Sequence, residues 1–140
     1  MPDLEALATD PRFVAALSAA RYERFEWHEA LLAVGDMEVL YLVRSVGGRF
    51  SLNLKSRSSA ERERATADEL ELIVDFLRFL VRSDVQVVHR GDTLPPGFQI
   101  EPGAGALTLV APDEAWRLTV PDGTAARVGL VAFAVEGRDR

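Results

Sequence analysis

The segment 66–82, TADELELIVDFLRFLVR, has the clearest helical pattern in the chain and constrains the rest of the fold. Thr66 followed three residues later by Glu69 is typical of a capping box, in which each side chain satisfies a backbone N–H of the first turn. Acidic residues lie near the expected N-terminus and Arg78 and Arg82 near the C-terminus, as the helix dipole favours. The sequence therefore predicts a helix over 66–82.

Apolar residues cover an unusually wide part of this helix. Its main stripe is widened by a flank of Leu72, Phe76 and Phe79 to roughly 220°, against the ~100° of an ordinary surface helix. The remaining narrow face is polar and is predicted to be filled by Glu71, Asp75, Arg78 and Arg82. One sheet cannot cover so wide an apolar arc. The flank must therefore pack against another part of the chain or against a partner.

Composition limits the classes of protein that this chain can be. Its 140 residues are enough for about one domain, so we expect residues 1–140 to form a single domain. The net charge of −6 would repel nucleic acid on average and attract a basic protein partner. There is no cysteine and no basic, apolar leader, and the longest uncharged run, 102–112, is far shorter than the ~20 residues of a membrane span. We expect a cytoplasmic protein that binds neither nucleic acid nor membranes.

Residues 1–21 form the first of three expected parts, an N-terminal helical segment. Asp10 followed by Pro11 is typical of an N-cap with proline at the first helical position. Phe13, Val14 and Leu17 then give the segment a modest apolar stripe. This helix is predicted to cover one flank of the central helix or the sheet.

Residues 22–82 form the second part, a β-meander followed by the central helix. The apolar period changes to two at Tyr22, which predicts a strand with Phe25 and Trp27 pointing inward. Strands over 30–34, 37–46 and 49–55 are separated by the turn signals Gly35-Asp36 and Gly47-Gly48.

Two-residue hairpins at those turns fix an expected register and two faces. They pair Leu32 with Val39, Tyr41 with Leu54 and Val43 with Leu52, and Phe50 joins this core face, on which the central helix should lie. The opposite face carries polar residues and a small apolar patch of Leu31, Leu40 and Leu42.

Residues 56–65, SRSSAERERA, have no apolar period and are predicted to be a polar, charged loop. Such a loop is most often solvated, but it can also be an interaction element. An apolar patch or helix flank that stays exposed would likewise mark a protein interface.

Residues 83–137 form the third part, a second meander with a C-terminal segment. The expected strands are 85–89, 98–101, 106–111 and 116–120. The segment 124–136 fits helical spacing and strand alternation almost equally well. Thr124, the alanines and Gly137 favour a helix. The predicted fold is α+β, with antiparallel β-meanders packed on a central amphipathic helix, an N-terminal helix and a C-terminal helix.

Three short patterns contain residue types that could carry chemistry. Glu26 and His28 lie on one face of the expected strand and could bind a metal, but no third ligand accompanies them. His89 lies near Asp84 and Asp92, but no serine stands in a nucleophile elbow. We therefore expect no catalytic, cofactor or metal site.

The Gly103-x-Gly105 fragment lacks the third glycine and the following helix of a dinucleotide loop, so it is interpreted as a turn.

The run 37–123 resembles a known family. A strand, a glycine turn in VGGRFSLNLKSR, an acidic and Arg-rich loop and then ATADELELIVDFL are similar to the immunity factors that neutralise secreted NAD glycohydrolases of the tuberculosis-necrotizing-toxin type. Leu94-Pro95 and a later stretch with Trp116, Leu118 and Asp122-Gly123 continue the resemblance. It implies a cytosolic, non-catalytic protein that binds a toxin domain and occludes its active site.

The leading hypothesis is accordingly an immunity protein with a protein partner, a toxin domain such as an NAD glycohydrolase. Its expected partner-binding residues, on the outer sheet face and the charged loop, are Leu40, Leu42, Arg44, Arg57, Arg62 and Arg64. The alternatives are a small-molecule-binding domain or enzyme with a pocket between sheet and helix, involving Glu26, His28 or His89, and a secretion-chaperone-like adaptor.

Overall fold

The computed structural model describes residues 3–86 and 93–138. The α+β prediction is confirmed: strands and helices alternate in blocks along the chain. The helices are α1 (Leu4–Ala8), α2 (Pro11–Ala20), α3 (Leu70–Ser83) and α4 (Ala126–Glu136), with a 3-10 turn at Pro112–Glu114. The strands are β1 (Glu23–Phe25), β2 (Leu32–Gly35), β3 (Val39–Val46), β4 (Arg49–Ser56), β5 (Arg62–Ala67), β6 (Gln99–Gly103), β7 (Ala106–Val110) and β8 (Arg117–Pro121).

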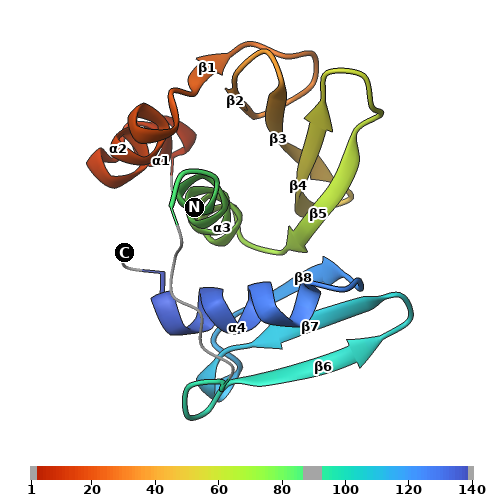
Figure 1. Cartoon of the computed structure of the whole chain (residues 1–140). Coiled ribbons are helices and arrows are strands. Elements are labelled where there is room, and N and C mark those ends of the chain that lie inside the picture. The colour runs from red at the N-terminus through yellow and green to blue at the C-terminus, as the bar shows by residue number, and fades with distance from the viewer. Residues whose placement is uncertain (1–2, 87–92, 139–140) are drawn as a thin grey trace.

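Within the described residues the strands form one antiparallel sheet of eight, in the order β1-β2-β3-β4-β5-β8-β7-β6. Two meanders, β1–β5 and β6–β8, therefore meet edge to edge at β5 and β8. Their seam is narrow, because Thr66 opposite Thr119 is the one ladder pair between these two strands. Figure 1 shows the first meander curving around α3, with the second meander below it.

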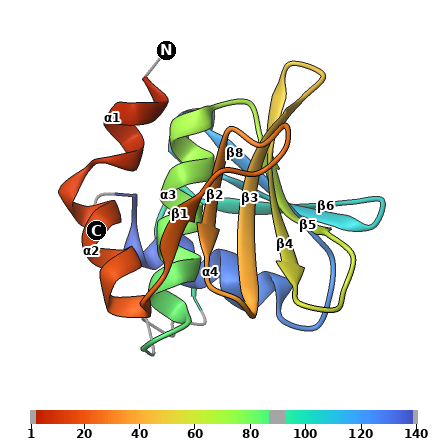
Figure 2. The same cartoon turned by 90° about the horizontal axis from the view of Figure 1, so that it is seen from above.

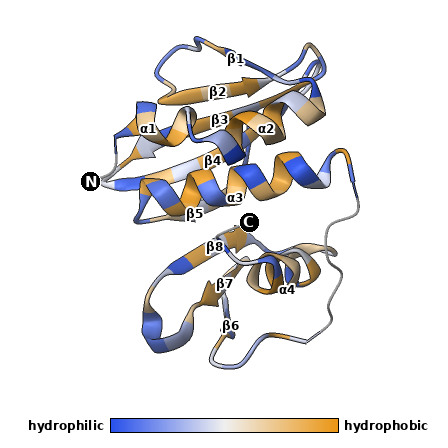
Figure 3. Ribbon diagram, turned by 90° about the vertical axis from the view of Figure 1, so that its left-hand side faces the viewer, coloured by the Kyte–Doolittle hydropathy of each residue, from blue (hydrophilic) through white to orange (hydrophobic). Residues whose placement is uncertain are grey.

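The helices lie on one side of the sheet (Figure 3). Figure 2 shows α1 and α2 beside α3 along the first meander. The N-terminal helix was thus placed correctly, and Asp10 caps α2 as expected, its carboxylate accepting from the Arg12 N–H at 2.8 Å with Pro11 at the first helical position. The main core lies between α3 and the sheet and includes the predicted inward residues Leu32, Tyr41 and Val43.

The start of the central helix was predicted wrongly. Thr66 does not cap it, because Thr66 lies in β5, where it pairs with Ser51 on one side and Thr119 on the other. Thr66 therefore pairs within the sheet instead of capping the helix, although the local pattern is that of a capping box. The helix begins four residues later, and its N-cap Glu69 makes no side-chain hydrogen bond to the first turn.

The wide apolar arc of α3 is confirmed, and the chain itself covers the flank. Phe133 of α4 packs edge-on against Phe76 and Phe79, with ring centroids 5.1 and 5.4 Å away. The centroid of the Trp116 ring lies 5.9 Å from that of Phe133. The flank of Leu72, Phe76 and Phe79 is therefore buried rather than an exposed interface, and α4 covers its two phenylalanines.

The expected polar face of α3 is not solvated throughout. Asp75 and Arg78 are buried and form an ion pair of 3.2 Å. Asp75 also accepts from Arg138 at 2.7 Å, and the Arg138 guanidinium lies over the Trp116 ring. The C-terminal residues fold back over this face, where the half-buried Arg138 supplies a second partner for the Asp75 carboxylate.

The register of the first hairpin also differs from the expected one. Leu32 faces Val43 instead of Val39, because the β2–β3 connection is longer than two residues and is closed by Asp36, which accepts from the N–H groups of Glu38 and Val39. The slip is an even number of residues, so each side chain keeps its face. The pairs Tyr41–Leu54 and Val43–Leu52 are confirmed.

The prediction of a polar loop over 56–65 is confirmed only for the first half of that segment. Arg62–Ala67 is strand β5, which the absence of an apolar period concealed.

In the second half of the chain β6, β7 and β8 confirm the meander and Ala126–Glu136 is a helix, which settles the open choice over 124–136. Of the strand expected at 85–89, Val85 and Gln86 lie in a turn and the rest falls outside the described residues. Among the described helices, none combines the length and apolarity needed to cross a bilayer.

Candidate functional site

The six residues expected to bind a partner separate into three groups in the fold. Leu40 and Leu42 lie on the outer face of the first meander, where they form a small second core with Ala33, against which Ala30 packs. Leu42 is 0% exposed. Neither leucine can therefore be the exposed anchor that the sequence suggested, because the loop 26–31 covers this part of the sheet.

Arg44 belongs to the same face and holds that loop in place. Its guanidinium donates to both carboxylate oxygens of Glu61, at 2.6 and 3.0 Å, and to the backbone carbonyl of His28 at 3.1 Å. The Asn53 amide donates to Glu61 at 2.6 Å. The Arg44 hydrogen bond lowers the pKa of Glu61. Arg44 thus joins the sheet, the 57–61 loop and the 26–31 loop.

Beside this network lies a groove on the outer face, which we call the outer groove. It has a volume of about 370 Å3, and Leu40 lies among the residues that line it. Large apolar side chains along it are Phe25, Trp27 and Met37, which are 40%, 43% and 82% exposed. Arg57 also lines the groove and forms an exposed ion pair with Glu38 at 3.3 Å.

The prediction that Phe25 and Trp27 point inward was wrong. Phe25 pairs with Ala33, and directly opposed residues of an antiparallel pair share a face, so Phe25 lies on the outer face. Tyr22 takes the inward position, where its hydroxyl donates to Asp84 at 2.7 Å and its ring lies 6.2 Å from Tyr41. The sequence pattern correctly indicated that faces alternate with a period of two here, but it gave the wrong set of residues as the inward-facing ones. Met37 lies between two acidic residues at a turn, and this position was the overlooked indication of an exposed apolar side chain.

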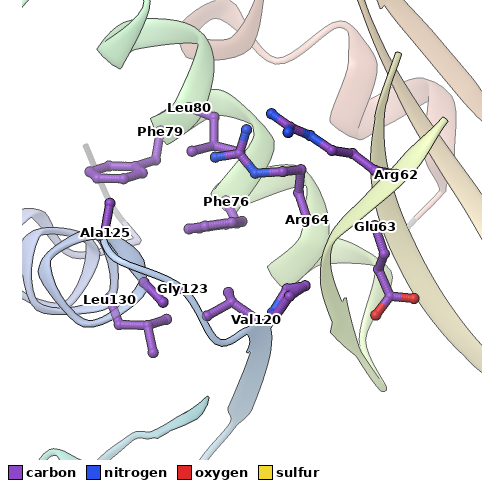
Figure 4. A pocket seen from close by; sticks show the side chains of 13 residues that line it. Arg62, Glu63, Arg64, Phe76, Phe79, Leu80, Val120, Gly123, Ala125 and Leu130 are labelled. Carbon is purple, nitrogen blue, oxygen red and sulfur yellow. The ribbon is translucent and has the colours of Figure 1, made fainter. Parts of the chain in front are cut away.

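Arg62 and Arg64 lie on the inner side of β5, on the face of the sheet opposite to this groove. They border a second cavity, of about 400 Å3, between α3, β5, β8 and the start of α4, which we call the arginine pocket. Figure 4 shows both arginine side chains directed toward α3 and Glu63 directed away from it. The rest of the wall is largely apolar, formed by Phe76, Phe79, Leu80, Val120 and Leu130.

A β-bulge in β5 produces this arrangement. Asn53 pairs with Glu63 and Leu52 with Ala65, so Arg64 is an extra residue in the ladder. Two successive residues of the bulged strand then oppose Leu52, and the alternation of faces shifts by one. Leu54 pairs with Arg62, so Arg62 faces inward while Glu63 shares the outer face with Asn53. Strict alternation from the buried Ala65 would have turned Glu63 inward and both arginines outward.

The other candidate residues do not come together as a centre for chemistry. His28 lies in a turn, with a side chain 90% exposed and 3.8 Å from Glu29, and Glu26 is in the loop that follows β1. In the ranges 3–86 and 93–138, no three His, Asp or Glu side chains are grouped so that they could hold a metal ion.

His89 and Asp92 fall outside the described residues. Asp84, their expected neighbour, accepts hydrogen bonds from the hydroxyls of Tyr22 and Tyr41 at 2.7 and 2.8 Å. Burial and this carboxylate both raise the pKa of Tyr41. Gly103 and Gly105 lie at the β6–β7 turn, as interpreted, with Gly105 at φ 70°.

Comparison with known proteins adds one finding about the fold. The structure is similar to that of Rv3902c from M. tuberculosis. The TM-score is 0.64 at 16% sequence identity, over 88% of this chain and 79% of the other. A similarity at this identity concerns the fold alone. No protein-family model matches the sequence, and no curated protein matches it.

Proposed function

We propose that this chain is a non-catalytic protein-binding module of the immunity type, which binds a secreted toxin domain and occludes its active site in the cytoplasm. The observation that carries the proposal is the outer groove. Trp, Phe and Met are enriched in protein interfaces, and buried aromatic anchors supply most of the binding energy. Phe25, Trp27 and Met37 combine these residue types, exposed, at one groove.

The charges around the groove indicate the kind of partner. Glu26, Asp36 and Glu38 line it, together with Lys55 and Arg57. Three acidic side chains against two basic ones leave acidic charge in excess at the groove, as over the whole chain with its net charge of −6. A partner with a basic patch around an apolar centre would be steered to this surface.

The resemblance of the run 37–123 to immunity factors suggests which toxin class to test, an NAD glycohydrolase. Of the residues first expected at the interface, Arg57 contacts the partner in this proposal, and Arg44 acts from beneath by holding the loop that presents Trp27. Leu40 and Leu42 support the groove from inside.

Calorimetry against an NAD glycohydrolase toxin domain tests the proposal, and a toxin domain encoded by a neighbouring gene is the first partner to use. Truncating a buried anchor typically costs at least ~2 kcal/mol, which is roughly a thirtyfold loss of affinity. Trp27→Ala and Met37→Ala should weaken binding to that extent and leave the thermal melt nearly unchanged, since both side chains are exposed. Val128→Ala is the matched control, because Val128 is an exposed apolar residue on α4. Equal affinities for Trp27→Ala and Val128→Ala would rule out the groove as the binding site.

A second candidate function is binding of a small molecule, which the arginine pocket favours. Its position between sheet and helix is where the sequence hypothesis placed such a site, but the lining residues are Arg62 and Arg64 rather than Glu26, His28 or His89.

A further inference from the structure

The arginine pocket combines unpaired positive charge with an apolar wall, and the partner-binding role of the outer groove uses neither. Most arginines of the described chain have a carboxylate partner, as Arg44 and Arg57 do. In residues 3–86 and 93–138, the side chains of Arg62 and Arg64 make neither an ion pair nor a hydrogen bond. In a chain with a net charge of −6, two neighbouring arginines without a carboxylate are an unusual arrangement.

The β-bulge in β5 determines which side chains of this strand face the cavity. It turns both arginine side chains toward α3, whereas the side chain of Glu63, which also borders the cavity, points toward the opposite face. β-Bulges are common next to functional sites because they redirect a side chain. Pro121, on the opposite wall, has no N–H with which to extend the ladder, so β5 and β8 remain apart beyond the Thr66–Thr119 pair.

The size and lining of the cavity define the ligand. Its volume of about 400 Å3 lies within the range of small-molecule sites, which are mostly apolar with a few convergent polar groups. Arginine binds planar carboxylates and phosphates through paired N–H donors. The rings of Phe76 and Phe79 and the side chain of Leu130 would shield an apolar body from water.

We propose that the arginine pocket is a binding site for a small amphipathic anion, with a carboxylate or phosphate head on Arg62 and Arg64 and an apolar body against α3 and α4. The site is separate from the outer groove, so this proposal does not depend on whether the chain binds a toxin.

Calorimetry with a matched set of probes tests this site. Octanoate and octyl phosphate carry the two head groups, octan-1-ol has the chain without the charge, and acetate has the charge without the chain. Octanoate or octyl phosphate should bind saturably with one site per chain, and the tighter of the two assigns the head group. Octan-1-ol and acetate should each bind at least tenfold more weakly. Equal binding of octanoate and octan-1-ol, or no saturable binding of either anion, would overturn the proposal.

Three variants locate the binding. The double variant Arg62→Gln/Arg64→Gln should weaken anion binding at least tenfold. Gly129→Leu should do the same through the apolar part, because Gly129 lines the cavity and a Cβ added there meets nothing within 4 Å. The control Arg57→Gln, in the outer groove, should leave anion binding unchanged. Unaltered binding in both the arginine double variant and Gly129→Leu would place the anion elsewhere and refute the assignment.

Discussion

Phe133 joins the two halves of the molecule, and its truncation tests whether residues 1–140 fold as one domain. It is 1% exposed and contacts the rings of Phe76 and Phe79 on α3 and of Trp116 in the second half. Truncating a buried Phe to Ala typically costs about 3–5 kcal/mol. Phe133→Leu keeps most of the buried area but loses the edge-on ring contacts, so we expect about 1–2 kcal/mol.

The assay is urea unfolding followed by two signals. The chain has two tryptophans, so the Trp27→Phe background leaves Trp116 as the fluorescent reporter of the second half, while far-UV circular dichroism reports the whole chain. Urea slopes of ~1–3 kcal/mol per M imply that Phe133→Ala lowers the midpoint by at least about 1 M. The two signals should move together. A midpoint that does not change, or fluorescence and dichroism transitions that separate, would refute the single-domain account.

Three further predictions concern particular side chains. Leu42→Asp should lower the melting temperature by more than about 10 °C, because it places a carboxylate in the buried second core; a nearly intact melt would contradict that burial. The lowered pKa of Glu61 means that its stabilising effect is present above the ordinary value of 4.5 and is lost as the pH falls through the lower folded-state pKa. The difference in melting temperature between wild type and Glu61→Gln should therefore be large at pH 7 and shrink below about pH 4, and a constant difference would exclude the Arg44 contact as its cause. Glu69→Ser should stabilise the protein by about 0.5–1 kcal/mol in urea melts, since this N-cap lacks a side-chain hydrogen bond; a loss of stability would show that Glu69 has another role.

The sequence predicted much of the fold because periodicity records which face of an element is buried. The breadth of the apolar arc of α3 correctly required a second covering element, which is α4. The alternation in β3 and β4 gave the correct faces and the pairs of Tyr41 and Val43. These features depend on patterns within one element or between adjacent strands, so they can be predicted locally.

The candidate sites depend on features that local patterns do not contain. The phase of β1 is set by its pairing with β2, which places Phe25 outward. The inward turn of Arg62 and Arg64 is set by a bulge against β4, in a segment with no apolar period. The burial of Asp75 depends on Arg138, 63 residues away in the sequence. Each of these requires knowledge of contacts between distant segments.

The most direct test of the central proposal is inhibition of the toxin's enzymatic activity. An NAD glycohydrolase domain of the tuberculosis-necrotizing-toxin type is titrated with the purified chain while NAD hydrolysis is measured, with the chain alone as a parallel sample. Occlusion of the active site predicts that hydrolysis stops near one equivalent of wild-type chain or Val128→Ala, that Trp27→Ala requires a large excess, and that the chain alone leaves NAD intact. Hydrolysis that continues at full rate with excess wild-type chain, or NAD consumption by the chain itself, would contradict the account.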